Sequence, residues 1–130
     1  MKENHINMTR FYRCDICGSM VGELHKAGTL VCCGQPMTEL AANTTDATLE
    51  KHVPVVALNG DELTVKVGSV AHPMADEHYI EWIYVRTEKG GQRRGFVPGQ
   101  EPELVFNVSQ DKPVEVLVYC NLHGLWASKI

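Results

Sequence analysis

The sequence lacks an apolar run long enough to cross a membrane, and its polar start, MKENHINMTRFYRC, lacks the apolar segment of a secretory signal. We therefore expect no membrane association and a cytoplasmic location. The 130-residue chain carries 12 Lys and Arg against 16 Asp and Glu, with no basic run beyond QRR. This acidic balance excludes nucleic acid as an expected partner, because phosphate backbones are bound by basic surfaces.

The chain also lacks the 3.6-residue apolar period of an amphipathic helix over more than one turn. From about residue 53, short segments instead alternate apolar with polar residues or are rich in β-branched residues: DELTVKVGSV, YIEWIYVRT, ELVFNV and VEVLVYC. The segments between them, EKGGQ, VPGQEP and SQDKP, have the composition of turns. Short strands at this spacing predict an all-β sandwich or barrel. We expect Trp82 and Trp126 to pack in its core or around a metal pocket.

Five cysteines are present, an odd number that cannot pair completely, and without a secretory signal disulfides are not expected. Four of them occur as CDIC and CC, and each pair is followed by glycine, in a fragment too small to bury a substantial core. Such fragments need a metal, and four thiolates select zinc or iron. The spacing does not choose between these metals. The candidate ligands are Cys14, Cys17, Cys32 and Cys33.

A polar, Thr-rich segment, ANTTDATLEKH, follows the cysteine-rich region and has the composition of a linker or surface loop. We place the boundary near Asn43. The predicted domains are a small metal domain over residues 1–42 and a β-sandwich over residues 43–130.

The fifth cysteine belongs to a second candidate site. Cys120 and His123 form a Cys-x-x-His pair after a predicted strand, and His72 and His78 flank a short loop. A lone histidine at a strand end is more often hydrogen-bonded or exposed than a ligand. However, a sandwich gathers its loops at its two ends, so that one end can hold this pair together with His52, His72 and His78. The spacing alone leaves both interpretations open.

The composition of this second set bears on the choice of metal. Blue-copper sites use a weak axial methionine, and no methionine follows His123. Five ligands leave one octahedral position open, which suits a reactive iron better than a closed structural zinc. Ferrous iron with four imidazoles and one thiolate is net positive and attracts an anion, whereas ferric iron with four thiolates is net negative. The second set is therefore predicted to be catalytic and the first to transfer electrons, with Lys51 placed to guide a small anion.

At this point the motifs CDIC…CCG, EKHVPV, GSVAHPM, HYIEW and YCNLHG resemble those of a two-iron superoxide reductase of the desulfoferrodoxin type. The resemblance extends from about Tyr12 to Trp126. It implies a desulforedoxin-like or rubredoxin-like domain followed by an immunoglobulin-like sandwich, in a homodimer. It also implies two irons per chain, one held by the four N-terminal cysteines and the other by a square of four histidines with Cys120 as axial ligand.

The resemblance further implies a reaction. Superoxide is reduced by one electron to hydrogen peroxide without release of oxygen, and a rubredoxin-like donor restores the ferrous state. Glu50 corresponds to a glutamate that can occupy the sixth position of ferric iron, and Lys51 to a lysine that assists superoxide entry and protonation. Two other classes share these ligands, namely a non-catalytic electron carrier and a redox-silent zinc module.

Overall fold

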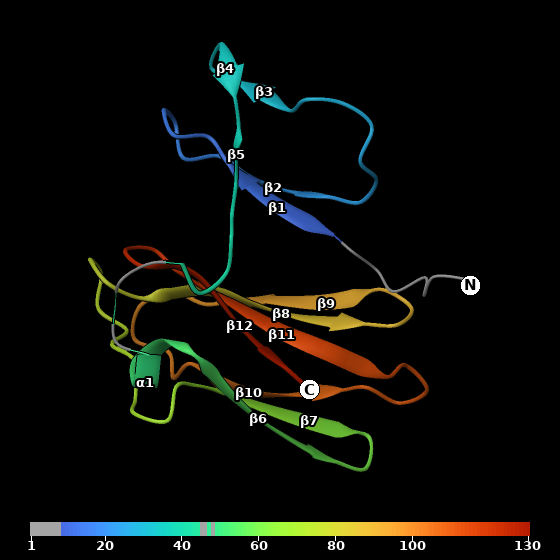
Figure 1. The fold of residues 1–130 in the computed structure, drawn as a ribbon. Coiled ribbons are helices and arrows are strands. Elements are labelled where there is room, and N and C mark those ends of the chain that lie inside the picture. The colour runs from blue at the N-terminus through green and yellow to red at the C-terminus, as the bar shows by residue number, and fades with distance from the viewer. Residues whose placement is uncertain (1–8, 45–46, 48) are drawn as a thin grey trace.

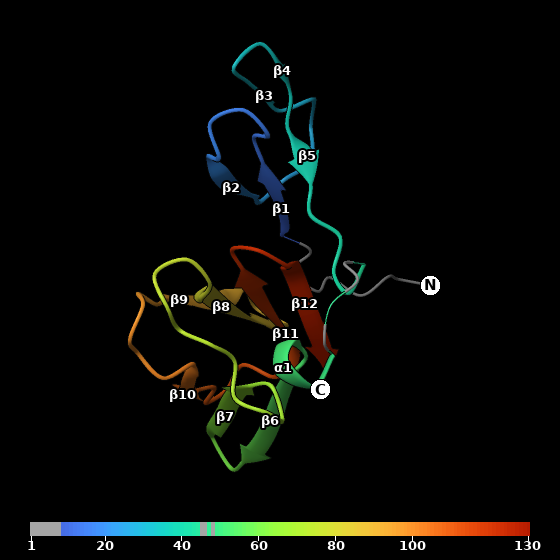
Figure 2. The same cartoon turned by 90° about the vertical axis from the view of Figure 1, so that its left-hand side faces the viewer.

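The computed structural model describes residues 9–44, 47 and 49–130 and consists of a small N-terminal unit and a β-sandwich (Figures 1 and 2). The N-terminal unit contains a three-stranded antiparallel sheet in the order β2-β1-β5 and a two-stranded β3-β4 ribbon. Its strands are β1 (Arg10–Arg13), β2 (Met20–Glu23), β3 (Val31–Cys32), β4 (Gln35–Pro36) and β5 (Thr38–Glu39). None of them is longer than four residues.

The sandwich packs a three-stranded sheet, ordered β10-β7-β6, against a four-stranded sheet, ordered β12-β11-β8-β9. All of its strand pairs are antiparallel. The strands are β6 (Pro54–Asn59), β7 (Glu62–Val67), β8 (Ile80–Thr87), β9 (Gly91–Gly95), β10 (Glu103–Asn107), β11 (Pro113–Cys120) and β12 (Gly124–Lys129). The predicted all-β architecture is confirmed. Among the described residues, no helix has the length and apolar character needed to span a membrane.

One local prediction was too long and another was wrong. The turn predicted over EKGGQ is confirmed for residues 88–90, which connect β8 to β9, but its last two residues belong to β9, an edge strand whose residues are all exposed. The predicted linker contains a short helix, α1 (Leu49–His52), while residues 45, 46 and 48 lie outside the described residues. Neither element has an apolar pattern that would identify it from the sequence. β9 is held by backbone pairing with β8, and α1 is a single turn.

The core of the sandwich lies between the two sheets and follows from strand alternation. Val116, Val118 and Cys120 of β11 face inward, whereas Leu117 and Tyr119 face outward. The alternation of β8 contains one irregularity, since the pairing of Tyr119 with Trp82 is followed by that of Cys120 with Ile80. Glu81 is therefore an extra residue in a β-bulge, a device that re-aims side chains close to functional sites.

The outward face of the four-stranded sheet is also buried, because the N-terminal unit covers it. The Phe11 ring lies 4.9 Å from the Trp82 ring and 5.1 Å from that of Tyr84. The Trp82 indole N–H donates a hydrogen bond to the Met20 sulfur, 3.2 Å away. Trp126 is fully buried in the sandwich core, as predicted, but Trp82 belongs to this contact between the two units.

The segment leaving the N-terminal unit is attached to the free edge of β12. Asn43 has a positive φ of 60°, and its backbone N–H donates to the Leu125 carbonyl at 2.9 Å. Its side-chain Oδ1 accepts from the Ala127 N–H at 2.9 Å, and its Nδ2 donates to the Ala127 carbonyl at 3.2 Å. The Asn43 amide thus acts as an added strand residue, which ties the connection between the units to the sheet.

Candidate metal centres

Among the residues that the structure describes, two clusters of potential ligands occur, one in each unit. In the N-terminal unit the four sulfur atoms lie within 4.8 Å of one another, and the cluster consists of Cys14, Cys17, Cys32 and Cys33. The Cys17 and Cys32 sulfurs are 3.6 Å apart, and those of Cys32 and Cys33 are 3.9 Å apart. All of these cysteines are free thiols. The structure therefore brings together the predicted four-thiol set.

Tight turns orient the sulfurs of Cys14 and Cys17. Gly18 has a φ of 82°, which favours glycine, and its N–H donates to the Cys14 carbonyl at 2.9 Å. The backbone N–H groups of Cys17 and Ser19 approach the Cys14 and Cys17 sulfurs at 3.5 Å and 3.4 Å. These amides offset negative charge on the two sulfurs, as expected of a thiolate site.

The electrostatics of the cluster call for a cation. Contacts with the Ser19 hydroxyl and backbone N–H lower the pKa of Cys17 to about 6. Hydrogen bonds with the sulfurs of Cys17 and Cys14 raise the pKa of Cys32 to about 12, because they favour the protonated thiol beside its neighbours. Four thiolates at this spacing are thus stable only around a positive ion, and the donor set fits zinc or iron.

The second cluster lies at one end of the sandwich, where strands of both sheets begin or end. His52 ends α1 just before β6, His72 follows β7, and His78 precedes β8. Cys120 ends β11, and His123 lies in the turn that leads to β12. The antiparallel pairing therefore gathers all five residues of the second predicted set.

The four imidazoles form a closed ring. The distances between the centres of neighbouring rings are 4.6 Å (His52–His72), 4.7 Å (His72–His78), 5.0 Å (His78–His123) and 4.9 Å (His52–His123). Neighbouring rings are close to perpendicular, at 78° to 89°, whereas His52 and His78 face each other across the ring, 6.3 Å apart and at 27°. The arrangement is a square of imidazoles.

Several ring nitrogens converge on the centre of this square. His52 Nε2 and His123 Nδ1 are 3.1 Å apart, a distance at which a shared proton or a cation is needed. The buried Nε2 atoms of His72 and His78 have no hydrogen-bond partner. His72 Nδ1 donates to the Pro73 carbonyl at 2.7 Å, which leaves the lone pair on Nε2. Unpaired buried polar atoms are costly, so these nitrogens indicate a ligand of their own.

The Cys120 sulfur completes the set. It lies 3.9 Å from His123 Nδ1, and the ligand atoms of His52, His78, Cys120 and His123 all fall within 4.8 Å of one another. Burial raises the pKa of the Cys120 thiol, while the backbone N–H groups of Leu122 and His123 offset this in part. A bound cation is what would hold this buried sulfur as a thiolate. The donor set fits iron, copper or zinc.

Packing around the square fixes the orientation of its rings. The indole of Trp126 stacks on His52 with ring centres 4.9 Å apart, and its N–H donates to the His123 carbonyl at 3.0 Å. A Cβ at Gly68 would overlap the Glu50 carbonyl oxygen and lie 2.7 Å from the carbonyl carbon of Lys51, so only glycine permits this close approach of α1. Sequence reasoning missed the role of Gly68, although its place in the GSVAHPM motif was a signal.

Glu50 and Lys51 are exposed on α1, beside the buried His52. The Glu50 carbonyl accepts hydrogen bonds from the Val70 N–H at 2.9 Å and the Ser69 hydroxyl at 3.3 Å, which fixes the backbone while the side chain points to solvent. Burial lowers the pKa of His78, and the Lys51 charge contributes to the same direction. The field of the Lys51 ammonium therefore reaches the histidine square.

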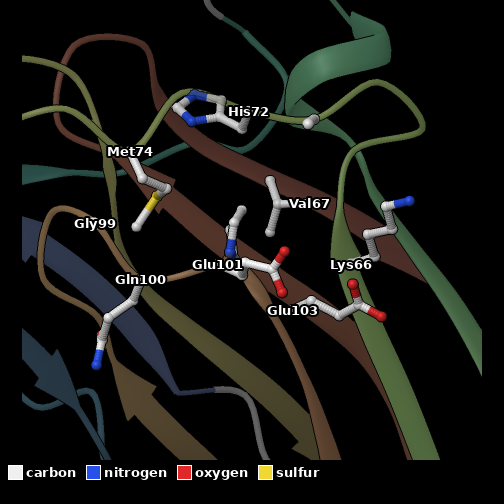
Figure 3. Close-up of a pocket in the computed structure, with 10 residues that line it drawn as sticks. Lys66, Val67, His72, Met74, Gly99, Gln100, Glu101 and Glu103 are labelled. Atoms are coloured by element: carbon white, nitrogen blue, oxygen red, sulfur yellow. The ribbon is translucent and has the colours of Figure 1, made fainter.

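A cavity of about 390 Å³ lies beside the square (Figure 3). Of the five described residues that form the second cluster, only His72 is on its wall. The same wall carries the carboxylates of Glu101 and Glu103 against the single ammonium of Lys66, as Figure 3 shows. With this net negative lining, the cavity would repel a small anion rather than admit one.

The burial of His72 predicts a pH dependence of the metal-free protein. Its pKa is lowered to about 4, mainly by burial, whereas an unfolded histidine titrates near 6.5. Between these values the unfolded chain binds a proton that the folded chain does not. We therefore expect the free energy of unfolding to fall by about 3 kcal/mol from pH 6.5 to pH 4.

Urea denaturation of the metal-free protein at a series of pH values measures this loss. His72→Gln should flatten the dependence, and His25→Gln, at an exposed position of the N-terminal unit, should leave it unchanged. An equal slope in wild type and His72→Gln would contradict the expected contribution of this group.

Comparison with known proteins agrees with this two-unit organisation. The desulfoferrodoxin family profile matches residues 44–129, and the desulfoferrodoxin N-terminal domain profile matches residues 7–40. The chain is 50% identical over 118 residues to a desulfoferrodoxin homolog of Archaeoglobus fulgidus, covering 90% of this chain and 94% of that protein. It is also 50% identical over 119 residues to a desulfoferrodoxin of Syntrophotalea carbinolica, covering 91% and 94%.

Among solved structures, the superoxide reductase from Treponema pallidum superposes with a TM-score of 0.77 at 36% identity, covering 93% of this chain and 98% of that one. Both the sequence similarity and the structural similarity thus extend over almost the whole chain and include both units. The two profile matches, the close relatives and the four-thiol and four-imidazole clusters together show that the chain belongs to the desulfoferrodoxin family.

Proposed function

We propose that the protein is a superoxide reductase, which converts superoxide, one electron and two protons into hydrogen peroxide. The square of four imidazoles with the buried Cys120 sulfur is the observation that carries the proposal. We assign as iron ligands the Nε2 atoms of His52, His72 and His78, Nδ1 of His123 and Sγ of Cys120. Iron bound by this set supplies the one-electron chemistry, and the relatives named superoxide reductase support the assignment.

The number of donors explains why the site would act on a substrate. Four imidazoles and one thiolate provide five donors, so a six-coordinate ion keeps one position for a small ligand. The thiolate of Cys120 would donate electron density to a metal held there, as thiolate ligands do in other iron proteins. Four thiolates in the N-terminal unit leave no such position for a tetrahedral ion, and we assign that cluster to a second iron that transfers electrons.

Lys51 provides the attraction for the substrate. The protein is net negative and the cavity beside His72 has an acidic wall, so a superoxide anion needs a local positive charge to approach. The Lys51 ammonium is exposed on α1, and its field reaches His78. We propose that it guides the anion to the square and assists its protonation, and that the exposed Glu50 carboxylate would supply a further oxygen donor to the oxidised metal.

Lys51→Ala is expected to slow the reaction with superoxide about two- to threefold at low ionic strength. A unit charge acting over about 8 Å in water contributes about 0.5 kcal/mol, and salt screens it over about 10 Å at 0.1 M. Pulse radiolysis at increasing salt measures the effect. Lys112→Ala, at an exposed position before the start of β11, is the control and should leave the rate unchanged. A Lys51→Ala rate equal to wild type at every salt concentration would remove this residue from the mechanism.

The remaining parts of the proposal follow from the family. They are a rubredoxin-like electron donor, a homodimeric assembly, a cytoplasmic location and a division of the chain into residues 1–42 and 43–130. The attachment of Asn43 to β12 supports that division, because Asn43 is itself hydrogen-bonded to a strand of the sandwich.

The decisive experiment supplies a known amount of superoxide to the reduced, iron-loaded protein and measures both hydrogen peroxide and oxygen. A reductase yields one peroxide per superoxide and no oxygen, whereas a dismutase releases both products. A simple electron carrier yields no peroxide above the spontaneous background. Metal analysis of the purified protein that finds only zinc would contradict the proposal directly.

A further inference from the structure

Asn121 lies between two of the segments that carry candidate ligands. It directly follows Cys120, and its side-chain Oδ1 accepts a hydrogen bond from the Tyr79 N–H at 2.9 Å. Its Nδ2 donates to the Glu77 carbonyl at 3.1 Å. The two residues that it contacts flank His78 on either side. The side-chain amide of Asn121 thus contacts the residues on both sides of His78, and Asn121 is itself adjacent to Cys120.

The side-chain contacts of Asn121 continue the pairing between β11 and β8 after β11 has ended. The ladder between β8 and β11 reaches Cys120, which pairs with Ile80, and the Asn121 N–H then donates to the Tyr79 carbonyl at 3.1 Å. Beyond this point the backbone turns away so that His123 can return to the square. The Asn121 side chain takes over the next two hydrogen bonds that a longer strand would have made, acting as a substitute peptide group.

The chemistry of this position is specific to asparagine. The Tyr79 N–H requires an acceptor and the Glu77 carbonyl requires a donor, and a primary amide offers both at this reach. Aspartate would place a second oxygen against the Glu77 carbonyl, and leucine, which has the same branched shape, would remove both hydrogen bonds. Loss of the acceptor for the part-buried Tyr79 N–H is destabilising, because a buried donor without a partner has lost its contact with water as well.

Backbone contacts attach this segment to β11 on the C-terminal side of His78, through the Cys120–Ile80 pair and the Asn121 N–H bond to the Tyr79 carbonyl. Ala75 and His78 exchange backbone hydrogen bonds of 3.0 Å and 3.1 Å, which close the loop on itself without attaching it to the strand that carries Cys120. The Asn121 side chain adds the contact on the N-terminal side, at Glu77, and so holds both flanks of His78. Its side chain therefore sets where the His78 imidazole stands relative to the Cys120 sulfur and to His123.

We propose that Asn121 is a positioning residue, which locks the His78 segment to the Cys120–His123 turn and so holds the histidine square in a metal-ready geometry. The part of this inference that concerns iron rests on the proposed function. The clamp itself does not, because it is formed by protein atoms alone.

The test compares Asn121→Asp with Asn43→Asp. Asn43 forms the same pair of hydrogen bonds, accepting from and donating to Ala127, but it does so at the linker. We expect Asn121→Asp to weaken Fe²⁺ binding at the histidine and cysteine site about 10- to 100-fold in competition with a chelator, as outer-shell changes do. Asn43→Asp should retain the wild-type affinity. Circular dichroism and thermal unfolding of each variant show whether its sandwich is folded.

A second measurement needs no iron. In the metal-free protein, Asn121→Leu should increase hydrogen exchange at the Tyr79 amide by more than tenfold, while amides in the middle of β11 keep their protection. This variant also decides the question if Asn121→Asp does not fold. Unchanged Fe²⁺ affinity in Asn121→Asp, or unchanged Tyr79 exchange in Asn121→Leu, would overturn the inference. A wild-type protein that binds no iron at the square would instead refute the proposed function, and the exchange result would still decide the clamp.

Discussion

Cys120→Ser is expected to abolish superoxide reduction and the thiolate-to-iron absorption of the second site, while the absorbance of the four-cysteine iron persists. The Cys120 sulfur is fully buried and faces the square of imidazoles, so no solvent ligand can replace it at the same place. A serine hydroxyl is harder and far less acidic than a thiol, and it remains protonated beside the metal. The loss of iron affinity should exceed the roughly 100-fold that removal of an outer-shell partner costs.

Peroxide yield from supplied superoxide and the visible spectrum of the oxidised protein measure this result together. The four-cysteine absorption serves as an internal standard for protein amount and iron supply, and circular dichroism reports folding of the sandwich. A variant that still produced one peroxide per superoxide would show that the sulfur is dispensable, and the assignment of the second site would fail with it.

The second large effect concerns the N-terminal unit. Cys32→Ala combined with Cys33→Ala is expected to unfold this unit and leave the sandwich folded. Its strands have two to four residues, too few to form a core of their own. Structural metal binding contributes about 10–16 kcal/mol in small zinc domains, which is more than a unit of this size can replace by packing.

Tryptophan fluorescence reports this unfolding selectively. Trp82 lies beneath the N-terminal unit, whereas Trp126 is in the sandwich core. The double variant should therefore show a red shift of the emission, and proteolysis should remove the residues before the sandwich. Trp82→Phe in the same background is the control, because it should remove the red shift. An unshifted spectrum together with resistance to proteolysis would mean that the unit folds without its metal.

The strands with an apolar period were predictable from the sequence, and those held by pairing alone were not. The segments of β7, β8, β10 and β11 alternate or are β-branched, so local sequence identifies them. In contrast, β9 has the sequence GQRRG with every residue exposed, and only its ladder to β8 makes it a strand. The α1 turn is likewise imposed by contact with Gly68 rather than by helix propensity.

The candidate ligands were predictable as two sets, because thiols and imidazoles are rare and their motifs are specific. Their arrangement was not, since the ring order depends on which strand ends meet at one end of the sandwich. Two supporting contacts were not predicted for the same reason, although Trp126 itself was expected in the core or around a metal pocket. The stacking of Trp126 on His52 and the clamp made by Asn121 join positions more than forty residues apart, and sequence spacing carries no information on such contacts.

The aromatic contact between the units has a consequence for protein engineering. A sandwich expressed from residue 44 onward would expose one continuous hydrophobic patch to water, formed by Trp82, Tyr84, Leu117 and Tyr119. Such a patch promotes self-association, so a stand-alone version requires polar replacements on this face. The N-terminal unit therefore shields this face of the sandwich in addition to carrying a candidate metal site. A chimera that exchanges the N-terminal unit also has to exchange the sandwich residues that contact it.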